Sequence, residues 1–467
     1  MRLSLDDIKT AEPGNWPSLP ERMFGPPINR GTEMPDHPEV RAAVDWFKSA
    51  MEPGEWEQRR KDAFFRFYQS LLGVSHDESK GRYFDTKDSF AWYLFLAEAF
   101  IDHPWNFEPM FGSRVVPVFA SLGRNLPLIA NLDNIGERIS RIVGPEKGQP
   151  NGPIFELLVA AAYRRHGAKV SFRPEQRGIA RSWDLDVKFP RKRYAVECKR
   201  METGEYNERE RTRMRALWRE ACSLVTSEGW SVFCDVDFRI PLEDVPDDYF
   251  LRKALEWHTS RLPSLLWTDS ISHGVIGELD LEPIRSVFQA GDEVLSAGTR
   301  IQELLTGRYV RYANIIQVGH FQHGMSPRFV SDCRQAVVLR WKSSSEKAIS
   351  GKARDVFRKL VEAHAQLPDD MDSIVHIGLE ALEDETVERA RFRKIMENTE
   401  GFDTKGKPLR FVYTHYFMPE SPPNDSWAFD ETAQWRRLTG RQRRPLLHPH
   451  LVLPEGMEVL PGPFWSV

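Results

Sequence analysis

Apolar and polar residues recur with two different periods along the chain, and the change of period divides it into two parts. From about residue 40 to 143 the apolar positions follow helical spacing. A further helix is expected over 153–166, because Pro153 stands where a helix begins and Gly167 stands where one ends. The pattern therefore predicts a helical N-terminal part.

Beyond Gly167 the pattern changes to the alternation that is typical of strands. Two neighbouring runs, 183–189 and 194–199, place apolar side chains on one face and mostly polar ones on the other. Strand and helix patterns then alternate towards the end of the sequence, which predicts a mixed α/β fold. The other predicted strands cover 169–173, 231–238, 275–279, 313–318, 335–341, 373–379 and 409–417, and the other predicted helices cover 208–226, 346–365 and 385–399.

Three regions follow from this order. Residues 1–145 contain a Pro-rich lead-in and a helical accessory domain, which ends at a cluster of Gly and Pro. Residues 146–245 form the expected core, a mixed sheet flanked by helices. Residues 246–467 form an α/β C-terminal region. The sequence leaves open whether its strands continue the core sheet.

Composition narrows the class of protein. The chain has 467 residues, 41% of them hydrophobic, and a formal net charge of -4, which indicates a globular protein rather than a generally basic one. Its longest apolar run, Phe90–Ala97, is too short to span a membrane, and the N-terminus has no apolar signal core. Four scattered cysteines do not form a disulfide framework. We expect a reduced, cytoplasmic protein without a membrane contact.

The first candidate for chemistry is Glu156, the one carboxylate in an otherwise apolar helical run over 154–163. Glu is rarely buried without a partner, since isolated burial costs several kcal/mol. Two interpretations are open. The side chain points to solvent, or it points at a cation or a lysine inside a site.

The second candidate is the pair Glu197 and Lys199, which share one face of a strand. A carboxylate that binds a metal beside a cation suits phosphodiester hydrolysis, because the metal offsets phosphate charge and acidifies water. The ammonium can orient that water or stabilise the developing charge.

The preceding strand supplies two further acids, and the turn between the strands decides which of them faces Glu197. A two-residue turn at Pro190 and Arg191 places Asp184 opposite Glu197, with Cβ atoms about 5 Å apart. A four-residue loop over 190–193 places Asp186 there instead. Proline fits poorly in the tight hairpin turns, so turn chemistry leaves both registers open.

This order of elements resembles the PD-(D/E)XK nuclease superfamily, which has the restriction-endonuclease-like fold. The resemblance covers about residues 153–240 and is carried by the helix with Glu156, by Trp-Asp-Leu-Asp-Val at 183–187 and by Tyr-Ala-Val-Glu-Cys-Lys-Arg at 194–200. It implies Asp184 and Glu197 as the motif acids, with Lys199 as the catalytic lysine and Glu156 as the helix acid. The thirteen-residue gap between the two motif acids favours Asp184 over Asp186. Trp183 stands where the family often has a proline.

Local charge agrees with a phosphate-bearing substrate. Residues 164–200 contain twelve Lys and Arg against four Asp and Glu, although the whole chain is slightly acidic. Cations around a small acidic centre would hold backbone phosphates while the acids hold a metal. The expected nucleic-acid contacts are Arg181, Lys192, Arg193 and Arg200.

We therefore expect a nuclease that depends on Mg²⁺ or Mn²⁺ and acts on DNA in preference to RNA. Its metal ligands would be Asp184, Glu197 and Glu156. If the two strands pair in the other register, Asp186 would take the place of Asp184. The competing interpretation is a catalytically inactive nucleic-acid-binding or assembly protein on the same fold. The sequence does not distinguish a monomer from a homodimer.

Overall fold

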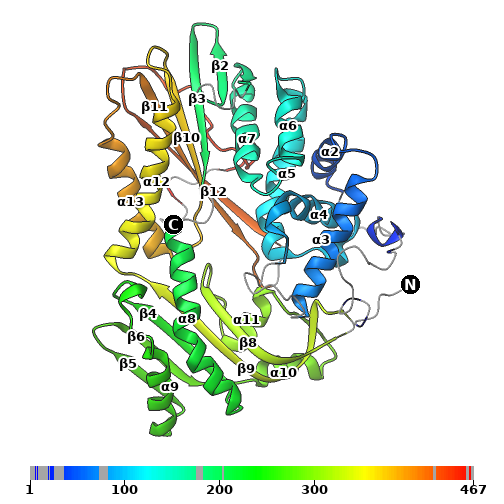
Figure 1. Ribbon diagram of the computed structural model, residues 1–467, viewed down its shortest axis with the longest axis vertical. Coiled ribbons are helices and arrows are strands. Elements are labelled where there is room, and N and C mark those ends of the chain that lie inside the picture. The colour runs from blue at the N-terminus through cyan, green and yellow to red at the C-terminus, as the bar shows by residue number, and fades with distance from the viewer. Residues whose placement is uncertain are drawn as a thin grey trace.

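The computed structural model describes most of the chain. The described residues are 6, 8, 19, 21–25, 36–72, 83–174, 182–201, 205–324, 326–423, 427–458 and 462–463, and the side chains of 205 and 353–355 are not described. Most of the Pro-rich lead-in lies outside these ranges. The described part is a mixed α/β structure with two mixed sheets flanked by helices, and a helical N-terminal part packs against the first sheet (Figure 1).

The N-terminal part is built around one apolar helix. α4 begins at Ser89, where the Asp88 carboxylate accepts a hydrogen bond from the amide of Ala91. Apolar residues occupy nearly all sides of this helix, and neighbouring helices bury them. The helices of this part are α2 (Pro38–Lys48), α3 (Glu55–Leu71), α4 (Ser89–Asp102), α5 (Pro109–Ile129), α6 (Ile135–Val143) and α7 (Asn151–Arg165), with short 3₁₀ turns at Glu21–Phe24, Thr86–Asp88 and Pro104–Asn106.

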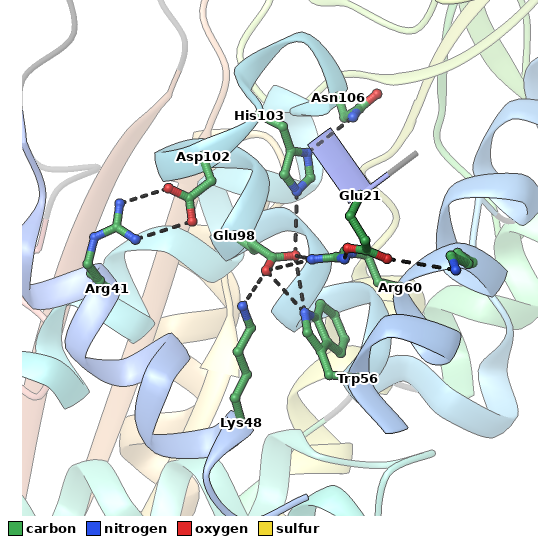
Figure 2. A network of polar contacts seen from close by, with 10 residues as sticks. Glu21, Arg41, Lys48, Trp56, Arg60, Glu98, Asp102, His103 and Asn106 are labelled. Atoms are coloured by element: carbon green, nitrogen blue, oxygen red, sulfur yellow. Dashed lines mark hydrogen bonds and ion pairs between the residues drawn. The ribbon is translucent and has the colours of Figure 1, made fainter. Parts of the chain in front are cut away.

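Glu98 of α4 is the centre of a buried polar network in these helices (Figure 2). Its carboxylate is 2% exposed and accepts hydrogen bonds from the indole of Trp56 at 3.1 and 3.2 Å. Lys48 and Arg60 form ion pairs with it, and His103 Nε2 lies 3.5 Å from Oε2. Two cations thus compensate one buried carboxylate.

The first sheet has six strands in the order β1-β2-β3-β10-β11-β12. Strands β3, β10 and β11 run parallel, and the outer pairs are antiparallel. α7 packs on one face with Tyr194, Val196 and Cys198 of β3, while α12 and α13 cover the other face. The elements are β1 (Lys169–Phe172), β2 (Leu185–Phe189), β3 (Lys192–Arg200), β10 (Ser373–Glu380), β11 (Leu409–Glu420), β12 (Ala428–Arg437), α12 (Glu346–Gln366) and α13 (Glu385–Glu400).

The second sheet belongs to a unit inserted between β3 and α12, at the bottom of Figure 1. Its strand order is β5-β6-β4-β9-β7, and β8 also pairs with β9. Helix α8 packs on it through Met214 and Trp218. The elements are α8 (Glu205–Ser227), β4 (Val232–Phe238), 3₁₀ turn Leu242–Asp244, α9 (Tyr249–Ser260), β5 (Ser264–Thr268), β6 (Ser272–Glu278), α10 (Glu282–Gln289), β7 (Val294–Leu295), α11 (Thr299–Thr306), β8 (Asn314–His323) and β9 (Phe329–Ser343).

The C-terminal region continues the first sheet, as the sequence left open, but the boundary between the second and third predicted regions is misplaced. The boundary expected at residue 245 falls inside the inserted unit, because α8 and β4 pack with the second sheet. Strands β10, β11 and β12 lie in the first sheet, although they come more than 170 residues after β3. Sequence periodicity predicts an element, whereas its strand partner depends on contacts between distant residues.

Candidate active site

The side chain of Glu156 is buried between α7 and α6. Its side chain is 10% exposed, and Oε2 lies 2.9 Å from Nη1 of Arg138. α7 lies between the first sheet and the N-terminal helices, so the face that carries Glu156 does not reach solvent. The interpretation that Glu156 points to solvent is wrong, and the cation that it contacts is Arg138.

The hairpin of β2 and β3 has the two-residue turn. Phe189 pairs with Lys192, which leaves Pro190 and Arg191 as the turn. Asp184 directly precedes β2, and its amide donates to the carbonyl of Val196 at 3.1 Å. Extended by one residue, the register of β2 and β3 places Asp184 opposite Glu197, and Oδ2 of Asp184 accepts a hydrogen bond from the amide of Cys198 at 2.8 Å.

Asp186, the alternative of the other register, has its own partners. Its carboxylate lies 3.1 Å from Arg193 and 3.4 Å from Arg173, and it accepts a hydrogen bond from the indole of Trp183. Asp186 pairs with Ala195 rather than with Glu197. The four-residue loop and the Asp186 register are wrong, because the strands pair up to Lys192.

Glu197 and Lys199 lie side by side on β3, as strand alternation predicts. Glu197 is fully buried, and Nζ of Lys199 lies 2.5 Å from its Oε1. Gln366, the last residue of α12, joins them: its amide nitrogen donates to Glu197 Oε1 at 2.8 Å, and its carbonyl accepts from Lys199 Nζ at 2.9 Å. The other oxygen of Glu197, Oε2, is buried with no hydrogen-bond partner in the described part of the chain.

The three carboxylates are close enough to affect one another's protonation. Burial raises the pKa of Glu156 well above its usual value, and the charge of Asp184 adds to this effect. Burial also raises the pKa of Asp184, although Lys199 opposes it. The pKa of Glu197 is raised well above normal by burial and by Asp184. Glu156, Asp184 and Glu197 thus form one acidic cluster, which we call the acid triad.

The cations near the acid triad do not compensate it. Burial lowers the pKa of the Lys199 ammonium, but Glu197 and Asp184 together outweigh burial, so the pKa lies above its ordinary value. Arg138 contacts Glu156, and the nearby Arg141 is already paired with Glu146. Among the described residues, Arg138, Arg141 and Lys199 act on these carboxylates, yet the pKa values of all three carboxylates stay raised, so a further positive charge would stabilise their ionised forms.

The donor atoms of the triad suit a hard divalent cation, because Mg²⁺ binds through carboxylate oxygens. Oε2 of Glu197 and Oε2 of Glu156 are both buried without a hydrogen-bond partner in the described part of the chain, and the charge of Asp184 acts on both acids. The described residues contain no ready-made group of three or more His, Cys, Asp or Glu side chains at metal-binding geometry. Asp184 and Glu197 fit best as ligands, with Glu156 held beside them by Arg138.

The predicted nucleic-acid contacts lie in different surroundings. Lys192 and Arg193 are exposed near the hairpin turn, and Arg193 also pairs with Asp186. The side chain of Arg200 is only 11% exposed, pairs with Glu380 at 3.4 Å and stacks on Phe417. Arg181 lies outside the described residues.

Two residues of the site were absent from the sequence prediction. Arg138 comes from α6 and Gln366 from the end of α12, and no motif at either position indicates a site. A weak signal exists only for Arg138, which interrupts the apolar face of a predicted helix. A cavity of about 590 Å³ lies elsewhere, on the second sheet near Asp235 and Arg340, and is not lined by the acid triad.

Comparison with known protein families, with curated proteins and with solved structures finds no match to this chain. Among the described helices, none combines the length and the apolar character that crossing a membrane requires.

Proposed function

We propose that the protein is a metal-dependent nuclease that hydrolyses phosphodiester bonds, with DNA as the preferred substrate over RNA. The observation that carries the proposal is the acid triad itself: Asp184 lies close enough to Glu197 to raise its pKa, Lys199 contacts Glu197, and the pKa values of all three carboxylates stay raised. Perturbed carboxylates that share one buried site are typical of functional centres. The order of elements around them also supports the resemblance to the PD-(D/E)XK superfamily.

Each residue has a distinct task in the proposed reaction. Asp184 and Glu197 hold the cation, and Glu156 supplies a third carboxylate whose position Arg138 fixes. When bound, Mg²⁺ supplies positive charge that offsets the phosphate charge and acidifies water. Lys199 orients the attacking water or donates to the charge that develops on the phosphate oxygens.

The test is cleavage of plasmid DNA in Mg²⁺ by the wild type and by Asp184→Asn and Lys199→Ala. We expect each change to lower the cleavage rate by about a hundredfold, the usual cost of one group that stabilises transition-state charge. Asp186→Asn is the matched control, because Asp186 lies two residues away with partners of its own, and it should cleave like the wild type.

Cleavage that survives both Asp184→Asn and Lys199→Ala would contradict the site assignment. A wild type that binds DNA with a strong salt dependence but never cleaves it would favour the inactive binding protein instead. Parallel assays on single-stranded DNA and on RNA measure the substrate preference.

A further inference from the structure

The turn of the β2–β3 hairpin carries cations without acidic partners. The hairpin reaches furthest at the top of Figure 1, beyond the end of α7. Lys188, Arg191 and Lys192 are exposed there and form no ion pair in the described structure. These three side chains extend into solvent, where they can meet an external anion.

A second group of cations reaches the same end of the first sheet from the segment after β12. Arg441 and Arg443 are exposed and unpaired in the described structure, and they flank Gln442, which donates to Asp372 at 2.9 Å. The carbonyl of Asp372 in turn accepts from the amide of Ala195 at 2.9 Å. This chain of contacts places the segment a few residues along β3 from the hairpin turn.

The acids at this end leave a surplus of positive charge. Asp372 is neutralised by Arg410 at 2.7 Å, and Asp186 is neutralised by Arg193. Asp369 pairs with Lys407, and Asp370 is the remaining acid of that loop. We define the basic end of the sheet by its five unpaired cations. They are Lys188, Arg191, Lys192, Arg441 and Arg443.

We propose that the basic end is a second phosphate-binding surface, which holds the nucleic-acid backbone at a distance from the cleaved bond. Lys192 precedes Glu197 by five residues of one strand, a separation of about 17 Å. Duplex DNA rises about 3.4 Å per base pair, so the surface meets the backbone about five base pairs from the acid triad. The distance to the cleaved bond rests on the proposed function, whereas the binding surface itself does not.

The substrate that this geometry selects is a polynucleotide with a flank on one side of the cleavage position. A duplex that ends less than about five base pairs beyond the cleavage position contacts the acid triad without reaching the basic end. A long duplex contacts both places. Its phosphates then release further counterions at the basic end, which raises its affinity.

The test measures binding of the full chain in EDTA, where cleavage does not contribute. Fluorescent duplexes of about 8 and about 30 base pairs are titrated at several salt concentrations. The variants are Arg191→Glu/Lys192→Glu and Arg441→Glu/Arg443→Glu. The matched control is Arg215→Glu/Arg219→Glu, two exposed and unpaired arginines on α8.

We expect each double change at the basic end to weaken binding of the long duplex by about tenfold or more and to reduce the salt slope by about two. The short duplex is about 27 Å long and also reaches the basic end, so it should lose affinity as well, whereas the α8 control should bind either duplex within a factor of about two of the wild type. The proposal is overturned if the variants bind the long duplex like the wild type, or if the α8 control loses as much affinity. It is also overturned if the wild type binds phosphatidylserine vesicles through these residues and no duplex.

The two proposals fail separately. If DNA binding depends on the basic end but plasmid DNA is never cleaved, the proposed nuclease activity is wrong and the proposed binding surface stands. If cleavage depends on Asp184 while the variants at the basic end bind and cleave long DNA normally, only the proposed binding surface is wrong.

Discussion

Two of the buried acidic centres in the described structure, those of Glu98 and Glu197, differ in how their charge is compensated. Glu98 lies among the N-terminal helices, and Glu197 lies in the first sheet, with almost no exposed surface in either case. Burial alone would raise the pKa of Glu98, but His103, Lys48 and Arg60 lower it to about 2. The pKa of Glu197 moves in the opposite direction, because burial and Asp184 outweigh Lys199.

The difference separates a network that the protein compensates by itself from a centre that it compensates less. Around Glu98 the compensation comes from the protein itself, so the network stabilises the helices without any further partner (Figure 2). Around Glu197 the protein leaves negative charge uncompensated, which costs stability and is retained where function needs it. Burial of an acid therefore identifies neither kind of centre, and what separates Glu98 from Glu197 is the direction in which the pKa of each is shifted.

The largest expected effect is on the compensated centre. Glu98→Gln leaves Lys48 and Arg60 near each other without their carboxylate, so we expect the free energy of unfolding to fall by about 3 kcal/mol. Urea unfolding at neutral pH measures this loss. Glu57→Gln, an exposed and unpaired glutamate on α3, is the matched control and should change stability by less than about 0.5 kcal/mol. An equal effect of both changes would contradict the interpretation of the network.

The same centre should give a characteristic pH dependence. The pKa of Glu98 falls from 4.5 to about 2 on folding, so its stabilising contribution is complete above 4.5 and is lost as the pH falls through about 2. The free energy of unfolding should therefore decrease with acid more steeply in the wild type than in Glu98→Gln. Parallel curves for the two proteins between these pH values would refute the low pKa.

A smaller effect is expected at Gln366, the neighbour that positions Glu197 and Lys199. Gln366 contacts both Glu197 and Lys199, so Gln366→Met removes their shared partner while retaining the side-chain volume. We expect kcat for DNA cleavage to fall by about tenfold, or about 1.4 kcal/mol, with KM nearly unchanged. Steady-state kinetics over a pH series checks this, because a positioning role also shifts the pH profile of Lys199. A variant that changes only KM would place Gln366 in substrate binding.

Much of the local structure could be predicted from the sequence. The helix expected over 153–166 is found as α7, and the run 194–199 lies within β3, because both follow from side-chain periodicity and from the Pro and Gly that bound them. Glu197 and Lys199 share a face for the same reason. The unpredicted strand β12 has many polar residues, since it lies at the edge of its sheet.

The rest depends on contacts between distant residues. Arg138 and Gln366 reach the acid triad from α6 and α12, and neither has a local pattern that indicates this. The turn also differed from its chemical expectation, because Pro190 occupies a two-residue hairpin turn that usually excludes it. The thirteen-residue gap supplied the correct register where turn propensity did not.

The most direct test of the uncompensated centre compares the thermal unfolding of the wild type and Glu197→Gln with and without Mn²⁺. Without the cation we expect Glu197→Gln to be more stable by about 1 kcal/mol, since it removes a buried charge whose pKa is raised. Because a raised pKa makes the wild type lose stability as the pH rises, this gap should widen towards alkaline pH. Saturating Mn²⁺ should raise the wild-type Tm by several degrees, about 2–3 kcal/mol, and should leave the Tm of Glu197→Gln unchanged. An equal Mn²⁺ shift in both proteins, or none in the wild type, would contradict a cation site at the acid triad.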